Sequence, residues 1–373
     1  MQGEKNNADP KDVADPKTFI EAKLRKRASE SRNIRNPAVF DMGYRPTKIL
    51  IRSEFERLAD DLADYVNLGV PKHIAVYGSR GSGKTLGAIT IAEALRESRG
   101  IPYFYVNVRE NPTSVKIYRR ITGLESKGHE VEYVKGKLDS MLSTKSILIL
   151  DEVDFLEDYD VLYHVTRHTK ANLILLTQKV YWYMGLDDES VKSSLQPDHI
   201  VFHDYDAEEM RKILTLRAEE GLVSYDESAI SMLAALVVKE YRSDARIGIK
   251  ALEIIGRTNR WGEGDVKSAI RQAYTEVEGE TLKSLSYRDL IILQALFKNP
   301  DTNTAYTEVS RHPYFSGSPP SKSTFFQGVN YLQNLGLITL IKKKVGRSYT
   351  MEAQLLLSDP ALIQSELDGR ANI

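Results

Sequence analysis

Three glycines, a lysine and a threonine stand at a fixed spacing in the run Gly-Ser-Arg-Gly-Ser-Gly-Lys-Thr, residues 78 to 85. An apolar run, Ile74 to Tyr77, precedes them, and apolar residues at helical spacing follow from Leu86. Glycines at these positions let successive backbone N–H groups approach an anion without a Cβ in the way. The pattern G-x-x-x-x-G-K-T between a strand and a helix predicts a loop that binds the phosphates of a nucleoside triphosphate.

Each residue of this loop has an expected role. Lys84 would reach the outer phosphates, and the Thr85 hydroxyl would bind Mg²⁺. The rest of the expected phosphate-binding set is Gly78, Ser79, Arg80, Gly81, Ser82, Gly83 and Leu86. A glycine-rich turn that binds nothing is the alternative, and the flanking strand and helix argue strongly against it.

Two carboxylates follow another apolar run. Ile147 to Leu150 read as a buried strand that ends in Asp151 and Glu152. Asp151 would hold the Mg²⁺ ion, and Glu152 would act as general base on the attacking water. An apolar strand with an acidic end is a weak signal alone, but it becomes strong after a phosphate-binding loop with one strand in between.

The elements around these motifs alternate between strand and helix up to residue 202. A helix is predicted over 53–68, and further strands over 103–108, 173–176 and 200–202. This alternation predicts a parallel sheet wrapped by helices. Only helices follow, and they predict an all-helical lid: 208–220, 227–241, 245–260 and 266–277.

The last ninety residues have a different pattern. Helices are predicted over 286–297, 306–310 and 321–335, followed by paired strands over 337–343 and 348–352. Three helices and a hairpin predict a winged helix-turn-helix. Residues 281–350 carry nine Lys and Arg against three acidic residues, although the whole chain has a net charge of −1. This local excess favours contact with DNA phosphates.

Two groups of residues would make that contact. The residues expected at the wing are Lys342, Lys343, Lys344 and Arg347. Those expected to face the groove from the third helix are Lys322, Ser323, Thr324, Gln327 and Asn330. Winged helices also bind proteins, which remains the alternative.

The composition of the chain excludes several kinds of chemistry and location. The chain has 373 residues, 42% of them apolar and none of them cysteine. Disulfides and thiolate chemistry are therefore excluded, and no run of apolar residues is long enough to span a membrane. We expect a cytoplasmic, nucleoid-associated protein. His164 and His168 stand four residues apart, but no third ligand accompanies them, so no zinc site is predicted.

The chain divides into four expected segments. We expect a flexible arm over 1–33, an α/β ATP-binding domain over 34–205, a helical lid over 206–280 and a winged-helix domain over 281–373.

Taken together, these motifs resemble the archaeal origin-recognition initiators, AAA+ ATPases related to the large subunit of the eukaryotic origin recognition complex. The resemblance extends from about residue 37 to the C-terminus. It rests on YGSRGSGKT, LILDEVDFL, VKSSLQPDHIVFHDYDAEEMRKIL and SDARIGIKALEIIG. It implies an ATP-dependent replication initiator that binds duplex origin DNA through the winged helix and the AAA+ domain. The replicative helicase (MCM) and paralogous initiators on adjacent sites are implied as partners.

The resemblance also implies roles for individual residues. Arg246 would be sensor 2, reaching the outer phosphates, and Gln178 would be sensor 1 where most AAA+ proteins carry Asn. Residues that would border the nucleotide are Leu50, Ile51, Arg52 and Tyr205. Lys127 and His129 fall near an insertion that contacts DNA in this family.

One departure from the AAA+ pattern concerns hydrolysis. Lys192-Ser193-Ser194-Leu195 occupies the segment where many AAA+ proteins carry a finger arginine. Such an arginine contributes roughly 10³–10⁵ in rate, so we expect slow turnover and a switch between ATP and ADP states rather than a motor. Two alternatives stay open: a branch-migration motor of the RuvB type, and a regulator of helicase loading whose winged helix binds protein.

Overall fold

The computed structural model describes residues 20, 21, 23, 33–124, 128, 130–180, 182–315, 317–345, 348–357 and 359–371. They divide into two compact units, one ending at Ala269 and the other beginning at Ile270. The predicted N-terminal arm lies almost wholly outside the described residues. The same holds for Lys127, His129 and Arg347.

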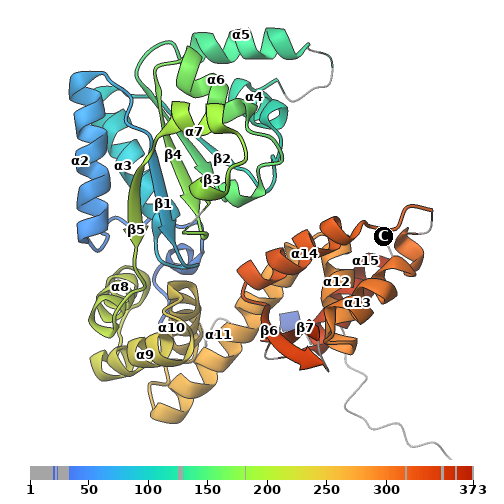
Figure 1. The fold of residues 1–373 in the computed structure, drawn as a ribbon. Coiled ribbons are helices and arrows are strands. Elements are labelled where there is room, and N and C mark those ends of the chain that lie inside the picture. The colour runs from blue at the N-terminus through green and yellow to red at the C-terminus, as the bar shows by residue number, and fades with distance from the viewer. Residues whose placement is uncertain are drawn as a thin grey trace, which may run out of the picture. The chain divides into compact units, whose positions relative to one another are not determined.

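The first unit is built on a five-stranded parallel sheet with the order β2-β3-β4-β1-β5 (Figure 1). Its strands are β1 (Ile74–Gly78), β2 (Tyr103–Asn107), β3 (Ser146–Asp151), β4 (Ala171–Thr177) and β5 (Asp198–Phe202). Each strand lies at or near the position predicted from its apolar run. The predicted parallel α/β sheet is therefore confirmed.

Alternate residues of the strands pack on opposite faces, as the two-residue period of a strand requires. On β3, Ile147 and Ile149 enter the core beneath α2 and α3, while Leu148 and Leu150 enter the core on the other side. All four side chains are fully buried. Both faces of β3 are covered, which explains why Ile147 to Leu150 are all apolar rather than alternating with polar residues.

The helices of the sheet domain follow the strands in sequence. They are α2 (Ser53–Leu68), α3 (Lys84–Arg99), α4 (Ser114–Thr122), α5 (Val131–Met141), α6 (Asp160–His168) and α7 (Glu189–Leu195). Short 3-10 turns lie at Pro37–Phe40, Val153–Phe155 and Tyr183–Gly185. α2 ends at Gly69, whose φ of 74° gives the left-handed conformation that closes a helix.

Four helices follow the sheet: α8 (Ala207–Gly221), α9 (Glu227–Glu240), α10 (Ala245–Thr258) and α11 (Glu263–Lys283). α8, α9 and α10 pack on one another. Asp206 forms a capping box with Glu209 at the start of α8, and Asp244 caps α10 by accepting a hydrogen bond from the backbone N–H of Arg246. α11 is six residues longer at its C-terminal end than predicted and continues into the second unit.

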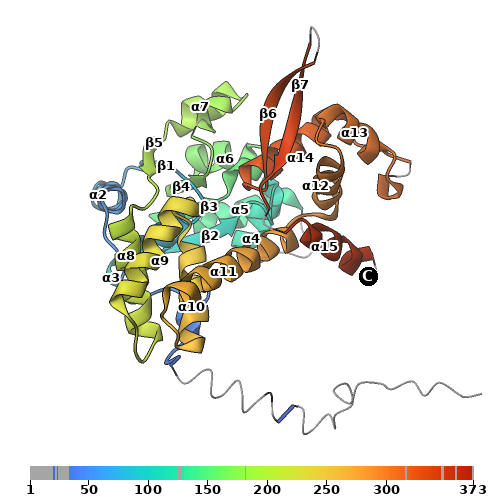
Figure 2. The same cartoon turned by 90° about the horizontal axis from the view of Figure 1, so that it is seen from below.

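The second unit contains three helices and a hairpin in the predicted order. The helices are α12 (Tyr287–Lys298), α13 (Thr302–Ser310) and α14 (Lys322–Asn334), with a 3-10 turn at Pro313–Phe315. β6 (Ile338–Val345) and β7 (Ser348–Leu355) pair antiparallel and form a long two-stranded ribbon (Figure 2). A bridge from Asp301 to Glu352 joins the start of α13 to β7.

A last helix, α15 (Ala361–Ala371), was not predicted. It packs on α12, and its residues Ile363 and Leu367 belong to the core of the second unit. Arg370 donates to the backbone oxygens of Lys283 and Leu285, at 2.7 Å each, and so closes the end of α11. Ile363 and Leu367 stand four residues apart just after Pro360, a helical signal that the sequence contained.

No described helix is both long enough and apolar enough to cross a lipid bilayer.

Candidate functional site

The phosphate-binding loop joins β1 to α3 with the expected backbone geometry. Gly81 and Gly83 have φ of 73° and 88°, in the left-handed region that disfavours other residues. A Cβ at Gly81 would collide with the Asp244 carboxylate, and one at Gly83 would collide with the Tyr205 hydroxyl. Besides turning the loop, these two glycines leave room for Asp244 and Tyr205, which follow the sheet in sequence and approach the loop closely.

Lys84 lies buried at the start of α3, with 8% of its surface exposed. Its Nζ donates to the backbone oxygens of Gly78 and Ser79, at 2.8 and 2.7 Å. Burial lowers the pKa of Lys84 to about 8, although the attraction of Asp151 and Asp154 opposes that shift. A buried ammonium group held only by carbonyl oxygens favours the arrival of an anion.

Thr85 and Asp151 meet at the expected metal position. The Thr85 hydroxyl donates to Oδ2 of Asp151 at 2.8 Å, and the Tyr105 hydroxyl donates to the same oxygen at 3.0 Å. Hydroxyl and carboxylate oxygens are the donors that Mg²⁺ accepts, and it commonly takes one or two protein ligands together with substrate phosphates and waters. The donor set therefore fits Mg²⁺ bound beside a polyphosphate.

Glu152 follows Asp151 in a strained backbone conformation, with φ 56° and ψ 47°. Burial raises the pKa of its carboxyl group, and Arg109 and Arg80 partly oppose that shift. A non-glycine residue in this conformation is uncommon and is often found at functional sites. The turn brings Glu152 to the cavity wall, where Asp151 and Asp154 also lie.

Asp154 links the acidic turn to the end of β4. Its carboxylate accepts hydrogen bonds from the Thr177 hydroxyl at 2.7 Å and from the backbone N–H of Gln178 at 3.2 Å. Gln178 lines the cavity, as its expected role as sensor 1 requires. No role was predicted for Asp154, although its place as a polar residue shortly after a parallel strand was an available signal.

Arg246 lies on the cavity wall at the start of α10. Its guanidinium is held by the carboxylate of Asp244, with Nε 2.9 Å from Oδ1 and Nη2 in contact with Oδ2. The expected sensor arginine thus faces the phosphate-binding loop, but in this structure a carboxylate of its own helix cap engages it.

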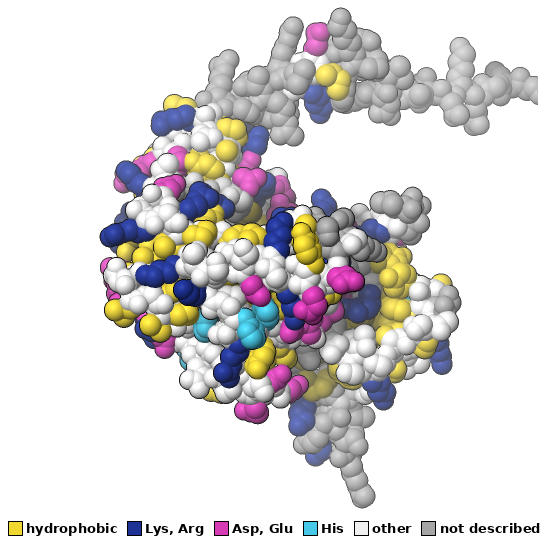
Figure 3. Space-filling model, turned by 90° about the horizontal axis from the view of Figure 1, so that it is seen from above, with side chains coloured by type: hydrophobic (Ala, Val, Ile, Leu, Met, Phe, Trp, Pro, Cys, Tyr) yellow, Lys and Arg dark blue, Asp and Glu magenta, His cyan; other side chains and the backbone are white. Residues whose placement is uncertain are grey.

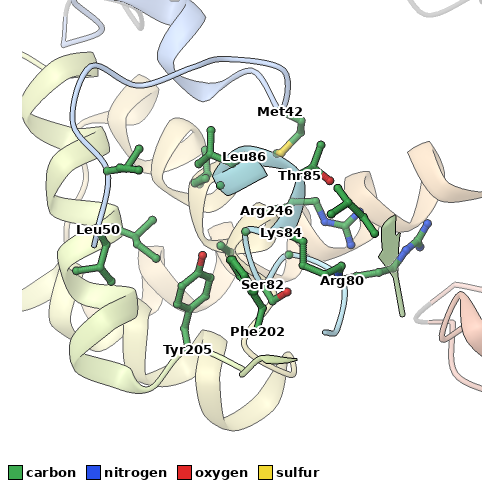
Figure 4. Close-up of a pocket in the computed structure, with 18 of the residues that line it drawn as sticks. Met42, Leu50, Arg80, Ser82, Lys84, Thr85, Leu86, Phe202, Tyr205 and Arg246 are labelled. Atoms are coloured by element: carbon green, nitrogen blue, oxygen red, sulfur yellow. The ribbon is translucent and has the colours of Figure 1, made fainter. Parts of the chain in front are cut away.

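A single cavity of about 410 Å³ joins these residues. Figure 4 shows Leu50 and Tyr205 on one side of it, with Thr85, Arg80 and Arg246 on the other. The apolar part of its wall is formed by Met42, Ile49, Leu50, Phe55, Leu86, Phe202, Ile213, Leu216 and Ile249. The cavity thus has a polar part suited to the polyphosphate of a nucleotide and an apolar part suited to its base.

The residues expected to border the base lie only partly at the cavity. Leu50 and Arg52 line it, whereas the side chain of Ile51 is 52% exposed and does not. The reason is the extended backbone, in which neighbouring side chains point to opposite sides. Tyr205 lines the cavity, and the Arg52 guanidinium lies 4.6 Å from the centroid of its ring.

Other parts of the wall were not predicted. Ile213, Leu216 and Arg217 reach it from α8, and Asn107 reaches it from the end of β2. The three-residue spacing of Ile213 and Leu216 was visible in the sequence, but it did not show which side of α8 faces the cavity.

In the second unit, the residues expected to contact DNA occupy two surfaces. Ser323, Gln327 and Asn330 are exposed and share one side of α14, and Lys322 is exposed at its start. Thr324 is half-buried, and its backbone N–H and hydroxyl both contact Ser321, the N-cap residue. Thr324 is therefore engaged in closing the helix.

The three lysines of β6 divide between the two faces of the hairpin. Lys343 lies 2.7 Å from Glu352 on the face that also carries the contact between Asp301 and Thr350. Lys342 and Lys344 lie on the other face because strand residues alternate. Two lysines therefore share one face, and the third is paired with an acid on the opposite face.

The histidine pair lies in α6 of the first unit, where His168 is exposed and His164 is largely buried. The rings of His164 and His168 are 5.0 Å apart between centroids, and His164 Nε2 lies 2.7 Å from the carboxylate of Asp139. Figure 3 shows a face on which histidines group together among mixed basic and acidic side chains. Within the described part of the chain, no group of three or more His, Asp or Glu residues could hold a metal ion.

Comparisons with known proteins extend over most of the chain. No protein-family model matches it. It is 28% identical over 358 residues to an ORC1-type DNA replication protein of Pyrococcus furiosus, covering 84% of each chain. It is also 28% identical over 388 residues to ORC1-type DNA replication protein 1 of Sulfurisphaera tokodaii, covering 92% of this chain and 95% of that one.

A solved structure gives the same result. The Aeropyrum pernix ORC1 protein in complex with DNA matches with a TM-score of 0.71 and 26% identity, covering 91% of this chain and 98% of that one. The resemblance to archaeal origin-recognition initiators, with their AAA+ α/β fold, is therefore confirmed.

The ion pair of Arg246 gives a first prediction. Replacing Asp244 with Ser keeps an oxygen that can cap α10 but removes the carboxylate that holds the guanidinium. We expect Asp244→Ser to bind a nucleoside triphosphate severalfold more tightly, because a negative charge near the phosphates is lost and Arg246 is released. Titration with a fluorescent ATP analogue measures the change. Weaker binding, with unfolding temperature preserved, would show that the pair positions Arg246 for the nucleotide.

The lowered pKa of Lys84 gives a second prediction. Above about pH 8 the free protein holds this side chain largely neutral, whereas a bound triphosphate would favour the ammonium form. Binding at pH 8.5 should therefore take up a fraction of a proton, and affinity should fall as pH rises further. Calorimetry in two buffers of different ionisation enthalpy measures that uptake. Lys84→Arg, which cannot lose its proton in this range, is the control. Equal uptake by both proteins would contradict the prediction.

Proposed function

We propose that this protein is an ATP-dependent DNA replication initiator that binds duplex origin DNA. The observation that carries the proposal is the cavity of the first unit, where Lys84, Thr85, Asp151 and Glu152 converge beside an apolar wall. Overall similarity to ORC1-type replication proteins, one of them solved with DNA, supports the choice of DNA as the partner.

The chemistry at the cavity would be transfer of the outer phosphoryl group to water. The backbone N–H groups of residues 78–85 and the Lys84 ammonium would hold the phosphates, and Arg246 would contact them on release from Asp244. Glu152 would orient the attacking water and accept its proton, which its raised pKa favours. Mg²⁺ held by Thr85 and Asp151 would neutralise developing charge on the phosphate oxygens. Gln178 would contact a phosphate or the water.

We infer that the chain has three functional domains. Residues 34–205 would form the ATP-binding domain, residues 206–280 a lid over the cavity, and residues 281–373 a winged-helix domain. α11 is continuous from the lid into the second unit, so a change of the lid that follows the nucleotide would be carried into the DNA-binding part. The helicase and neighbouring initiators remain proposed partners, on resemblance alone.

The DNA contact would use the exposed side of α14 and one face of the hairpin. Ser323, Gln327 and Asn330 offer hydroxyl and amide groups suited to base edges, and Lys322 offers a charge for a phosphate. On the hairpin, Lys342 and Lys344 share the face opposite to the one on which Glu352 contacts Lys343. The proposal therefore commits to one face of the hairpin.

That commitment gives a third prediction. The double substitution Lys342→Ala with Lys344→Ala should weaken binding to duplexes of any sequence and reduce the salt slope of log affinity by about 2. Lys343→Ala is the matched control and should change the slope by much less, because Glu352 already neutralises that lysine. Filter binding across a salt series measures both. If the double variant and Lys343→Ala lost equal DNA affinity, the chosen face of the hairpin would be wrong. If binding by the wild-type protein did not depend on salt, the alternative of a protein-binding regulator would be favoured.

Hydrolysis gives a fourth prediction. Lys192 to Leu195 lie in α7 without an arginine, so the isolated protein should turn over ATP at below about one per second. Glu152→Gln should abolish turnover while binding persists, since the change removes the proton acceptor and keeps the shape of the side chain. Steady-state phosphate release measures both. Fast turnover that DNA stimulates, together with ring hexamers, would favour a branch-migration motor instead.

A further inference from the structure

The segment before α2, residues 33–50, crosses the first unit and is called the strap here. Its first part lies along the end of α8 like a strand. The backbone N–H groups of Arg35 and Asn36 donate to Gly221 O at 2.8 and 3.1 Å, and Ile34 forms an antiparallel bridge with Leu222. The strap is thus joined to the helices of the proposed lid through backbone hydrogen bonds.

Two glycines make this contact possible. A Cβ at Gly221 would lie 2.6 Å from Cζ of Phe40 in the strap. A Cβ at Gly256 would lie 2.5 Å from Cδ2 of Leu222 and 3.2 Å from Cδ1 of Ile34. The distances of 2.6 and 2.5 Å are shorter than non-bonded carbon atoms tolerate, so close packing of the strap on α8 and α10 depends on the absence of side chains at these glycines.

Arg217 of α8 joins the strap to the cavity. This arginine is 7% exposed, it lines the cavity, and its Nη1 donates to Val39 O at 2.8 Å. Its guanidinium carbon lies 5.4 Å from the centroid of the Tyr44 ring, and the Tyr44 hydroxyl contacts the carboxylate of Glu220. A buried guanidinium group that loses its partners costs free energy. Separation of the strap from α8 would break the contacts of Arg217 and is therefore opposed by this cost.

The later part of the strap forms the wall of the cavity itself. The strap residues that line it are Asp41, Met42, Pro46, Lys48, Ile49 and Leu50. Ile213 and Leu216 of α8 line the same cavity, and Arg45 forms an ion pair with Glu93 of α3. One segment therefore contacts the proposed lid, the nucleotide cavity and the helix that follows the phosphate-binding loop.

We propose that the strap is a latch that sets how long a nucleotide stays bound, with Arg217 as the residue that couples it to the lid. The proposal rests on the proposed function, because it takes the ligand of the cavity to be a nucleoside di- or triphosphate. The wall formed by the strap is fastened to α8, so a ligand that leaves the cavity past this wall would displace the strap from α8 or move the two together. The strength of the contact between the strap and α8 would then control the rate of nucleotide release, while the contacts to the phosphates stay unchanged.

Loosening the latch is the first arm of the experiment. Gly221→Ala should displace Phe40 and speed release of a fluorescent ADP by about tenfold, mostly through the dissociation rate. Gly136→Ala is the matched control, because Gly136 also lies in a helix, α5, but a Cβ there would meet nothing within 4 Å. Equal release rates from these two proteins in stopped-flow measurements would overturn the latch.

Locking the latch is the second arm, and it does not depend on a destabilising change. The chain has no cysteine, so Ile34→Cys with Leu222→Cys introduces the only pair. Residues opposite one another in an antiparallel bridge lie about 4.5–5.5 Å apart at Cα, within the range of a disulfide. Oxidation should slow ADP release severalfold, and dithiothreitol should restore the rate of the reduced protein.

The outcomes separate the two proposals. Release that is the same in the oxidised and reduced protein overturns the latch and leaves nucleotide binding intact. A wild-type chain that binds neither ADP nor ATP overturns the proposed function, and the latch with it.

Discussion

A buried ammonium group at the carboxyl end of β1 is the constraint on which the rest of the first unit depends. Lys84 is almost fully removed from water and contacts only backbone oxygens of its own loop. The positive end of α3 points to the same place, because Lys84 opens that helix. The buried ammonium group and the N-terminal end of α3 together form a positive site that a polyphosphate would neutralise. The nearby carboxylates of Asp151 and Asp204 accept hydrogen bonds from Thr85 and Ser79, whereas the ammonium group donates to backbone oxygens.

Strand order explains how the remaining groups arrive. β4 lies between β1 and β3, so the end of β4 stands between the phosphate-binding loop and the acidic turn. Asp154 connects that turn to Thr177 and Gln178, and the left-handed backbone of Glu152 redirects the chain after β3. Each of these residues lies at or just after the end of a strand that the core holds on both faces. The site is thus positioned by buried strands, while the strap, α8 and α10 supply further parts of the cavity wall.

Much of this could be predicted from the sequence, because local patterns determined it. Apolar runs that end in Gly78 and Asp151 marked the strands, and the glycine spacing marked the loop. What could not be predicted depends on contacts between distant segments. Nothing near Met42 or Arg217 in sequence indicates that they share a wall, and nothing near Arg246 distinguishes a phosphate contact from its ion pair with Asp244. Ile51 is a different case, since the alternation of an extended segment could have excluded it once Leu50 was chosen. α15 was missed although its apolar spacing was present.

The central proposal is that a nucleotide bound in the first unit would govern how the second unit binds DNA. The most direct measurement is duplex affinity at one salt concentration, with the protein saturated by ADP or by a non-hydrolysable ATP analogue. Lys84→Ala serves as the protein that cannot respond. We predict that the wild-type affinities differ between the two nucleotides and that those of Lys84→Ala do not. Identical wild-type affinities, with both nucleotides shown to be bound, would contradict the account.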